Sequence, residues 1–236
     1  MRRVNIDWKT YLKPPFHSEG KIFVGIAALI TLVLLTIGGT FWLLVGLILT
    51  TFVLYFFRNP RRMVPDKPGL VVAPASGIVQ AIGEVEPPAE LGLEGGKRVC
   101  VSIFLSVFDV HVNRVPVGGT VTKIVYTKGK TMNAAFDKAS EENERNAVVV
   151  KTADNRQVAF TQIAGQIARR IRCDIKENQT VLTGDVMGLI RFGSKVDILL
   201  PPGVNPTVVP GQTMISGETV IADLNSKEAA WTAVQR

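Results

Sequence analysis

The fold is indicated most clearly by the stretch Val72-Ala73-Pro74-Ala75-Ser76-Gly77-Ile78-Val79, in which apolar residues flank a turn-forming Pro-Ala-Ser-Gly segment. A similar pattern occurs near the C-terminus, where Val208-Val209-Pro210-Gly211-Gln212 leads to Gly217-Glu218-Thr219-Val220-Ile221. Each stretch is typical of a strand, a tight turn and a second strand. Two such units far apart in one chain favour a domain built from short strands.

Short runs rich in Val and Ile alternate with turn residues from residue 70 onward, which predicts a mainly β sandwich or barrel. The turn at 153–156 joins two of these runs into a hairpin. Residues 133–145 are rich in Ala, Lys and Glu and are expected to form a loop or a short helix. The expected strands are Leu70–Val72, Gly77–Val85, Val99–Phe108, Gly119–Tyr126, Ala147–Thr152, Val158–Ile163, Thr180–Leu182, Lys195–Leu200 and Thr219–Leu224.

An apolar run precedes this domain. From Ile22 to Phe57 the chain has 36 consecutive residues without a charge. One straight helix of that length would span about 54 Å, whereas the hydrocarbon core of a bilayer is about 30 Å thick. Gly38-Gly39-Thr40 divides the run into two shorter blocks. We therefore expect a hairpin of two short membrane helices within residues 1–57, a linker at 58–69 and a folded domain at 70–236.

Basic residues flank the apolar run at Arg2, Arg3, Lys9, Lys13 and Lys21 before it and at Arg58, Arg61 and Arg62 after it. Because basic flanks stay on the cytoplasmic side of a membrane, both ends of the hairpin and the folded domain are expected there, at the cell membrane. The formal net charge of +7 also suits an anionic membrane surface. Nucleic acid is not an expected partner, because no basic run is interleaved with aromatic residues.

Gly193-Ser194 is the only Gly-Ser dipeptide in the chain, and apolar, strand-like residues surround it. A serine hydroxyl can attack the carbonyl of the preceding residue, and a glycine leaves that carbonyl unobstructed. The resulting ester can eliminate to dehydroalanine, which hydrolyses to a pyruvoyl group. The dipeptide by itself is also compatible with a plain bend in a barrel strand.

Two more motifs accompany Phe192-Gly193-Ser194, namely FLSVFDVHVNRVP at Phe104–Pro116 and KASEENERN at Lys138–Asn146. Together the three motifs resemble those of the phosphatidylserine decarboxylases, in the short pyruvoyl-dependent form that includes archaetidylserine decarboxylase-like relatives. The resemblance extends from about Arg58 to the C-terminus. It implies a barrel-sandwich hybrid-like catalytic domain, and the repeated strand-turn stretches also resemble lipoyl and biotinyl carrier domains of that architecture.

The resemblance implies decarboxylation of phosphatidylserine to phosphatidylethanolamine. The chain would cleave itself between Gly193 and Ser194, and the cofactor would be a pyruvoyl group derived from Ser194 that forms a Schiff base with the serine amine. The two fragments would remain together as a heterodimer, with a homo-oligomer as a further option. The expected partners are a phospholipid substrate and the membrane, and no metal is expected.

His111 is the only histidine of the folded domain and lies in Asp109-Val110-His111. Alternation along a strand would place Asp109 and His111 on the same face, where the carboxylate can orient the imidazole. We expect the pair to supply the general base and acid, although a lone histidine can also be purely structural.

Two positions depart from the family pattern. Arg114 replaces a second histidine of the long-form members; it cannot act as a base but can bind a carboxylate or phosphate. Ser76 replaces the aspartate of a Pro-x-Asp-Gly motif and can only donate or accept a hydrogen bond. Arg145 is a third candidate for substrate binding, with a solvated charged turn as its alternative.

Two competing functions come from other classes. A membrane-tethered carrier or scaffold with a lipoyl-like barrel would keep an intact chain without a carbonyl group. No lysine occupies a Met-Lys-Met-like hairpin tip, which argues against a swinging arm. A self-processing enzyme for a soluble amino acid is the other competitor, and the membrane segment argues against it.

Overall fold

The computed structural model describes residues 15–129, 143–165, 170–191 and 194–234. The chain divides between Arg61 and Arg62 into an N-terminal helical unit and a C-terminal β unit. Residues 62–69 belong to the β unit. The backbone N–H of Met63 donates to Glu218 at 3.2 Å, and Lys67 forms an ion pair with Asp223 at 2.8 Å.

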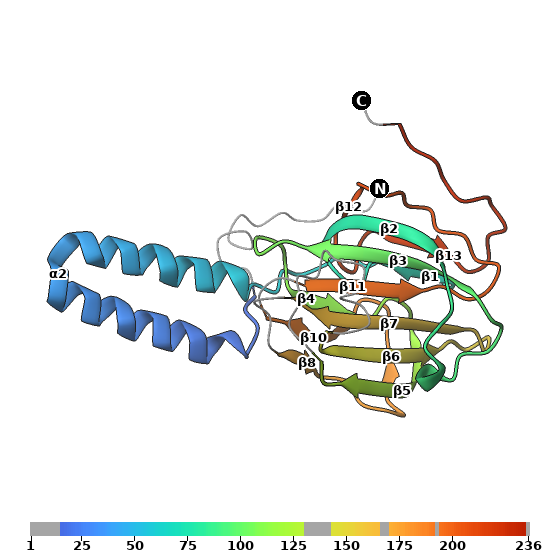
Figure 1. The fold of residues 1–236 in the computed structure, drawn as a ribbon, viewed down its shortest axis with the longest axis horizontal. Coiled ribbons are helices and arrows are strands. Elements are labelled where there is room, and N and C mark those ends of the chain that lie inside the picture. The colour runs from blue at the N-terminus through green and yellow to red at the C-terminus, as the bar shows by residue number, and fades with distance from the viewer. Residues whose placement is uncertain (1–14, 130–142, 166–169, 192–193, 235–236) are drawn as a thin grey trace. The chain divides into compact units, whose positions relative to one another are not determined.

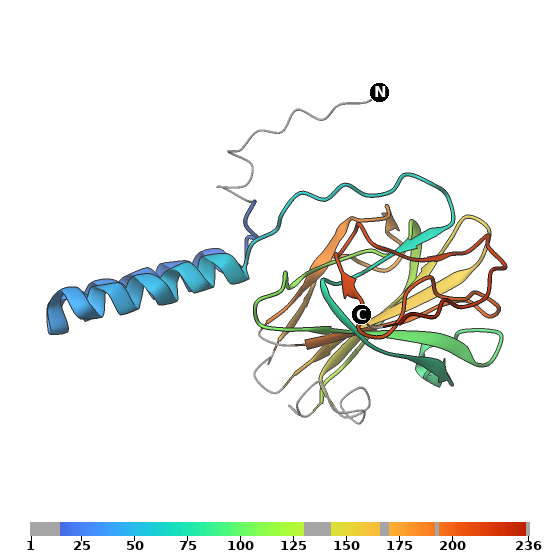
Figure 2. The ribbon, with the colours of Figure 1, turned by 90° about the horizontal axis from the view of Figure 1, so that it is seen from above.

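The helical unit is a hairpin. Helix α2 (Gly20–Phe56) contains one non-helical residue, Gly39, whose φ of 64° and ψ of −150° reverse the chain. Figures 1 and 2 show the two arms lying side by side. The hydroxyl oxygens of Thr31 and Thr50 are 3.0 Å apart across the arms, and a Cβ at Gly46 would lie 2.7 Å from Thr31 Oγ1. A small residue at 46 therefore permits the close approach of the arms.

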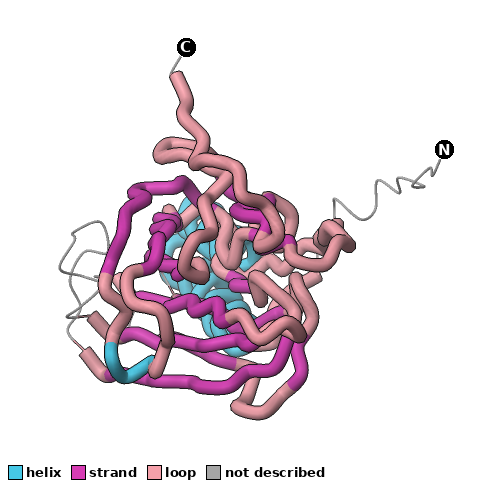
Figure 3. Tube along the Cα trace, turned by 90° about the vertical axis from the view of Figure 1, so that its right-hand side faces the viewer, coloured by secondary structure: helices cyan, strands magenta, loops and turns pink. Residues whose placement is uncertain are grey.

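The β unit is built from three antiparallel sheets, and Figure 3 shows their strands in magenta curling around the interior. The order of the large sheet is β12-β2-β3-β11-β7-β6-β5-β9, that of the second sheet is β4-β10-β8, and β1 pairs with β13. The bounds are β1 Leu70–Val72, β2 Gly77–Val85, β3 Arg98–Leu105, β4 Val112–Arg114, β5 Gly119–Thr127, β6 Arg145–Lys151, β7 Gln157–Ala164, β8 Ile171–Cys173, β9 Thr180–Val181, β10 Val186–Ile190, β11 Ser194–Leu199, β12 Thr213–Met214 and β13 Val220–Asp223, with a short 3-10 helix at Ala89–Leu91.

The main core fills the inside of the curled sheet. In β11, Val196 and Ile198 are fully buried in this core, while Lys195 and Asp197 alternate with them and line the opposite face. A smaller apolar cluster, which includes Leu91 of the 3-10 helix, covers part of that opposite face. The inner face of the central strands is therefore apolar, whereas their outer face is apolar only where the smaller cluster packs and elsewhere carries polar side chains such as Lys195 and Asp197.

The expectation of a mainly β fold with an N-terminal helical hairpin is confirmed. The turn at 153–156 also joins β6 to β7, with Asn155 at a φ of 67°. The predicted strand Val99–Phe108 was too long at its C-terminal end. The observed strand, β3, ends at Leu105, and the chain then turns at Ser106–Asp109. The expected loop or helix at 133–145 lies almost wholly outside the described residues.

Candidate active site

Ser194 is the first residue of β11 and is fully buried. Its backbone neighbours are Leu105 in β3 and Ala164 in β7, so two strands hold it in register. Alternation directs its side chain to the same inner face as Val196. The hydroxyl oxygen has no hydrogen-bond partner among the described residues. A buried polar group of this kind costs about 1–3 kcal/mol, which makes Ser194 a functional candidate.

The other half of the expected cleavage site, Gly193, lies outside the described residues. The structure nevertheless fixes both sides of this connection, because β10 ends at Ile190 and β11 begins at Ser194. The connection leads from the second sheet to the large sheet.

The link between β3 and β4 joins the same two sheets in the opposite direction. It begins after Leu105, beside Ser194, and ends at His111, whose backbone oxygen accepts a hydrogen bond from Ile190 N at 3.4 Å. The topology therefore brings His111 and Ser194 to one edge of the β unit, where the two links run between the same strand pairs. His111 is buried, with 1% of its surface exposed.

The expected geometry of Asp109 and His111 is wrong. Both residues lie in the link rather than in a strand, so alternation does not apply to them. The Asp109 carboxylate accepts the backbone N–H of Ser106 at 2.8 Å and closes the Ser106–Asp109 turn. The Asp109 atom that lies within hydrogen-bond distance of the imidazole is its backbone oxygen, at 3.0 Å from His111 Nδ1.

This contact determines the tautomer of His111. A carbonyl oxygen can only accept a hydrogen bond, so Nδ1 must carry the proton. In the neutral ring, Nε2 is then the basic nitrogen. His111 can therefore act as a base through Nε2.

Ser76 lies at the same edge of the large sheet. The following residue, Gly77, passes so close to the end of β3 that a Cβ there would lie 2.0 Å from the backbone oxygen of Phe104. The Ser76 hydroxyl donates to Ser216 Oγ at 3.2 Å and accepts the Ser216 backbone N–H at 3.1 Å. Ser76 thus connects the edge of β3 to the C-terminal segment.

Arg114 lies beside the same Pro-Ala-Ser-Gly segment. Its backbone N–H donates to the oxygen of Pro74 at 2.9 Å, and its guanidinium donates to the oxygen of Gly184 at 2.8 Å. Burial, and then the nearby charge of Arg62, lower the pKa of Arg114. Glu218 and Asp185 act in the opposite direction, so Arg114 lies in a cluster of both charge signs.

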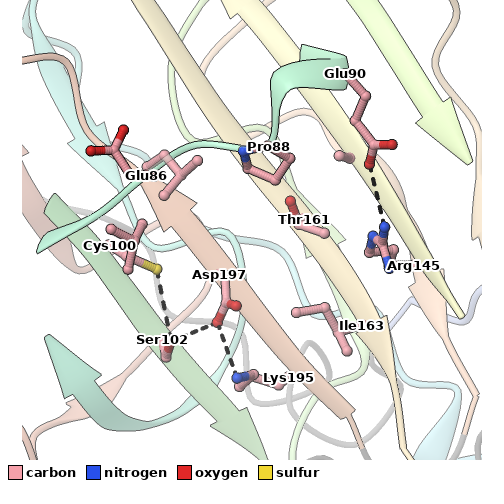
Figure 4. A pocket seen from close by; sticks show the side chains of 13 residues that line it. Glu86, Pro88, Glu90, Cys100, Ser102, Arg145, Thr161, Ile163, Lys195 and Asp197 are labelled. Carbon is pink, nitrogen blue, oxygen red and sulfur yellow. Dashed lines mark hydrogen bonds and ion pairs between the residues drawn. The ribbon is translucent and has the colours of Figure 1, made fainter. Parts of the chain in front are cut away.

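Arg145 occupies a different place. It lines a cavity of about 480 Å³ on the face of the large sheet opposite to Ser194 and forms an ion pair with Glu90 at 3.5 Å. Figure 4 shows Lys195, Asp197 and Ser102 interacting elsewhere in this cavity; Ser102 donates to Asp197 at 2.6 Å. Arg145 and Ser194 point to opposite faces because Arg145 is paired with Ile163, which is paired with Lys195.

Four buried amides of the described residues escaped the sequence-based reasoning: Asn113, Asn143, Asn146 and Gln162. The sequence does contain a signal for one of them, because Gln162 alternates with Phe160 and Ala164 at positions that face the core. No group of three or more His, Cys, Asp and Glu side chains within the described ranges could hold a metal ion.

Comparisons with known proteins agree with the motifs. The family model for phosphatidylserine decarboxylase matches residues 49–222. A phosphatidylserine decarboxylase proenzyme of Rhodospirillum rubrum is 60% identical over 238 residues, which cover 100% of both chains. The proenzyme of the same name from Cereibacter sphaeroides is 52% identical and covers 96% of this chain and 97% of its own. That from Paramagnetospirillum magneticum is 51% identical, with 95% and 93% covered.

Proposed function

This chain belongs to the phosphatidylserine decarboxylase family, and we propose that it decarboxylates the serine head group of phosphatidylserine to give phosphatidylethanolamine after cleaving itself before Ser194. The observation that carries the proposal is the buried Ser194 hydroxyl, which has no partner among the described residues and lies at the same edge as His111. The names of the relatives, all proenzymes, support a processing step.

Self-cleavage needs only groups of this chain and water. The Ser194 oxygen bonds to the carbonyl carbon of Gly193, and its proton passes to Nε2 of His111. The carbon–nitrogen bond then breaks and the nitrogen takes a proton, which leaves an ester and a free amine. Loss of the Ser194 Cα proton breaks the Oγ–Cβ bond and releases Gly193 as a carboxylate. Water replaces the nitrogen of the remaining dehydroalanine, ammonia leaves, and a pyruvoyl group remains.

The surroundings of Ser194 suit such a group. The residue begins a strand that is paired on both sides, so its position does not depend on the peptide bond to Gly193. The pyruvoyl ketone supplies a Schiff-base partner for the serine amine and an electron sink for the bond to CO2. We propose that His111, whose Nδ1 lies 3.0 Å from the Asp109 backbone oxygen, returns a proton after CO2 leaves.

The roles that we propose for the three candidate substrate-binding residues depend on where they lie relative to Ser194. Arg114 and Ser76 are proposed to contact the anionic groups of the substrate, because both lie at or beside the edge that carries Ser194. Arg145 lies on the opposite face of the sheet, and its role in substrate binding stays a prediction.

A membrane location is proposed from α2, which is long and apolar enough to cross a bilayer. The hairpin would place residues 15–19 and the β unit on one side of the membrane, and the basic flanks favour the cytoplasmic side. A lipid substrate could then stay in the bilayer during catalysis. Labelling of introduced cysteines from either side of sealed vesicles tests this; labelling of residue 15 and the β unit from opposite sides would exclude the hairpin.

Intact-mass analysis of the purified protein tests the processing step. We expect a large fragment ending at Gly193 and a small fragment of Ser194–Arg236 that reacts with a carbonyl reagent. Ser194→Ala should remain one chain without decarboxylase activity. An uncleaved wild-type chain without a carbonyl group would favour the carrier or scaffold alternative instead.

A further inference from the structure

The cavity of about 480 Å³ lies on the outer face of the large sheet, which is the face opposite to the Ser194 side chain. Its volume falls within the range of about 300–1,000 Å³ that small-molecule sites occupy. Strands β3, β11, β7 and β6 form its floor, and residues of the segment 85–90 form another wall (Figure 4). The proposed self-cleavage and decarboxylation steps do not use this cavity.

The pairing of the strands determines how charged side chains are spread over the floor. Lys195 in β11, Ile163 in β7 and Arg145 in β6 form one row across the sheet. Asp197 and Thr161 lie opposite each other in the next row. Because neighbouring strands are about 4.8 Å apart, the backbones of the two cationic residues are about 10 Å apart. Their long side chains can therefore approach one anionic group above Ile163.

Both cations of the floor have a carboxylate partner, but the pairs are long. Lys195 Nζ is 3.7 Å from Asp197 Oδ1, and Arg145 Nη2 is 3.5 Å from Glu90 Oε1. Charge-assisted hydrogen bonds between such groups are typically about 2.7–2.9 Å long. An ammonium group has three N–H donors and a guanidinium has five, so each cation can bind a further acceptor and keep its carboxylate.

Two other polar side chains of the cavity are open to a ligand. Within the described ranges, neither the Thr161 hydroxyl nor the Glu86 carboxylate has a hydrogen-bond or ion-pair partner. Thr161 belongs to the floor, whereas Glu86 is an exposed residue of the segment 85–90 (Figure 4). A hydroxyl can donate to an oxyanion, and an unpaired carboxylate attracts a cation. The two groups thus favour opposite charges at different walls of the cavity.

The lining as a whole disfavours ligands of a single charge sign. Three carboxylates and two cations line the cavity. A simple anion would be repelled by the carboxylates, and a simple cation by the lysine and the arginine. A molecule that carries both signs avoids this conflict. The apolar lining residues Val85, Pro88 and Leu199 suit a short hydrocarbon link between its two charged groups.

We propose that this cavity binds a small zwitterion in which a primary ammonium group and an oxyanion are joined by a short hydrocarbon link. The ammonium group contacts Glu86, and the oxyanion accepts hydrogen bonds from Thr161 and the two cations of the floor. Free amino acids and phosphorylated amino alcohols share this chemistry. The site is separate from the reacting serine, because alternation directs the Ser194 side chain to the inner face.

Isothermal titration calorimetry of the full chain in detergent tests this proposal with L-serine and phosphoethanolamine as probes. The Ser194→Ala variant is titrated, because it has no serine from which a pyruvoyl ketone could form and react with the amine. We expect saturable binding of at least one zwitterion, about tenfold or more tighter than that of ethanolamine, acetate or inorganic phosphate, which each carry one charge sign. Binding of only one zwitterion identifies the preferred oxyanion as carboxylate or phosphate.

Substitutions in the same background separate the two ends of the ligand. Glu86→Gln changes one exposed side chain and should weaken zwitterion binding about tenfold without affecting acetate or phosphate. Thr161→Val removes the hydroxyl at similar volume and should weaken the zwitterion several-fold. Glu84→Gln is the matched control, since Glu84 is also exposed but does not line the cavity, and should bind like the parent chain.

Hydrogen exchange locates the bound molecule, because the segment 85–91 should exchange more slowly when the zwitterion is present. No saturable binding of either zwitterion up to about 10 mM would overturn the inference. Equal affinity for ethanolamine, unchanged affinity in Glu86→Gln, or protection confined to segments outside the cavity would also overturn it. If Thr161→Val does not fold, Glu86→Gln decides. The titrated chain is uncleaved by design, so a failure of the proposed self-cleavage would leave this result unaffected.

Discussion

At the residue scale, the contact between the Asp109 backbone oxygen and His111 Nδ1 has a chemical consequence, because it leaves Nε2 as the basic nitrogen of a neutral ring. Here a backbone oxygen orients the imidazole, a function that a carboxylate commonly performs. The Asp109 side chain has a different partner, because its carboxylate accepts the backbone N–H of Ser106. The backbone of the link between β3 and β4 therefore contributes to orienting the His111 ring.

Replacement of His111 should affect the two proposed steps differently. A positioned acid or base contributes about 10²–10⁴-fold in rate. Self-cleavage occurs once per molecule, whereas decarboxylation must repeat, so His111→Ala should accumulate cleaved chain while losing nearly all turnover. Denaturing electrophoresis and CO2 release measure the two steps. A variant that cleaves and turns over at close to the wild-type rate would remove His111 from the mechanism.

Cys100 allows a test of the cavity on the opposite face of the sheet. Burial, and then the charge of Asp197, raise the pKa of the Cys100 thiol from 9.0 to about 12. Native protein at pH 8.5 should therefore react slowly with iodoacetamide at this residue, and unfolding in urea should remove the protection. Mass spectrometry of the modified peptide measures the rate; rapid alkylation in the native state would contradict the assignment.

The same shift implies a pH dependence of stability. Because the folded pKa lies above the unfolded one, the thiol ionises first in the unfolded chain as the pH rises. The free energy of unfolding should therefore fall between about pH 9 and pH 12. The Cys100→Ala variant should lose this part of the decrease, since it has no thiol to ionise, and serves as the matched control in denaturant titrations.

At the scale of elements, the two arms of α2 meet through small and hydroxyl-bearing residues. Thr31 and Thr50 approach to 3.0 Å, and Gly46 leaves room for Thr31. Apolar side chains alone would provide little drive for this contact in lipid, because lipid tails are equally apolar. The hydrogen bond and the close packing specify which faces meet.

A cross-link tests this pairing. Thr31→Cys combined with Thr50→Cys should form a disulfide when the membrane-bound protein is oxidised, since the side chains are within bonding reach. The control pair, Leu29→Cys with Thr50→Cys, places one thiol on an exposed side of the helix and should not cross-link. Fragment analysis after proteolysis measures the bond. Equal cross-linking of both pairs would show that the arms have no fixed register.

The elements differ in how far the sequence predicts them. The longer strands and the 153–156 turn follow from Val- and Ile-rich runs and from turn residues. The predicted strand at 99–108 was too long because Val107 and Phe108 look strand-like, whereas a local hydrogen bond between Ser106 and Asp109 turns the chain. Strands of two or three residues, such as β4 and β8, have no periodicity of their own and depend on pairing with β10.

The residues of the candidate site also differ in how far the sequence predicts them. Ser194 and His111 are identifiable from residue type and motif, since a Gly-Ser dipeptide and a single domain histidine are rare signals in this chain. The amides are not, because what distinguishes Asn113 is an N–H group left without an acceptor, and this depends on Gln162 from another sheet. Pairing of distant strands creates that property, and no local pattern encodes it.

At the scale of the whole molecule, the proposed cleavage divides a sheet between two fragments. The small fragment would supply β11, which lies between β3 and β7 of the large fragment, as well as β12 and β13, which pair with β2 and β1 (Figure 1). All three strands would thus keep their neighbours on the other fragment. Separation would expose two edges of the central sheet together with the core, so the fragments should remain associated without a covalent link.

If the two fragments share the sheet, the thermal stability of the protein should depend on protein concentration only after cleavage. Unfolding of the cleaved protein releases two chains, so its Tm should rise with protein concentration by mass action, whereas uncleaved Ser194→Ala unfolds as one chain and should show no such dependence. Thermal unfolding at protein concentrations spanning about two orders of magnitude, in one detergent, measures the difference. Native mass spectrometry should detect both fragments as one species below the Tm. A Tm independent of concentration in fully cleaved protein, or fragments that separate without denaturant, would contradict the shared sheet.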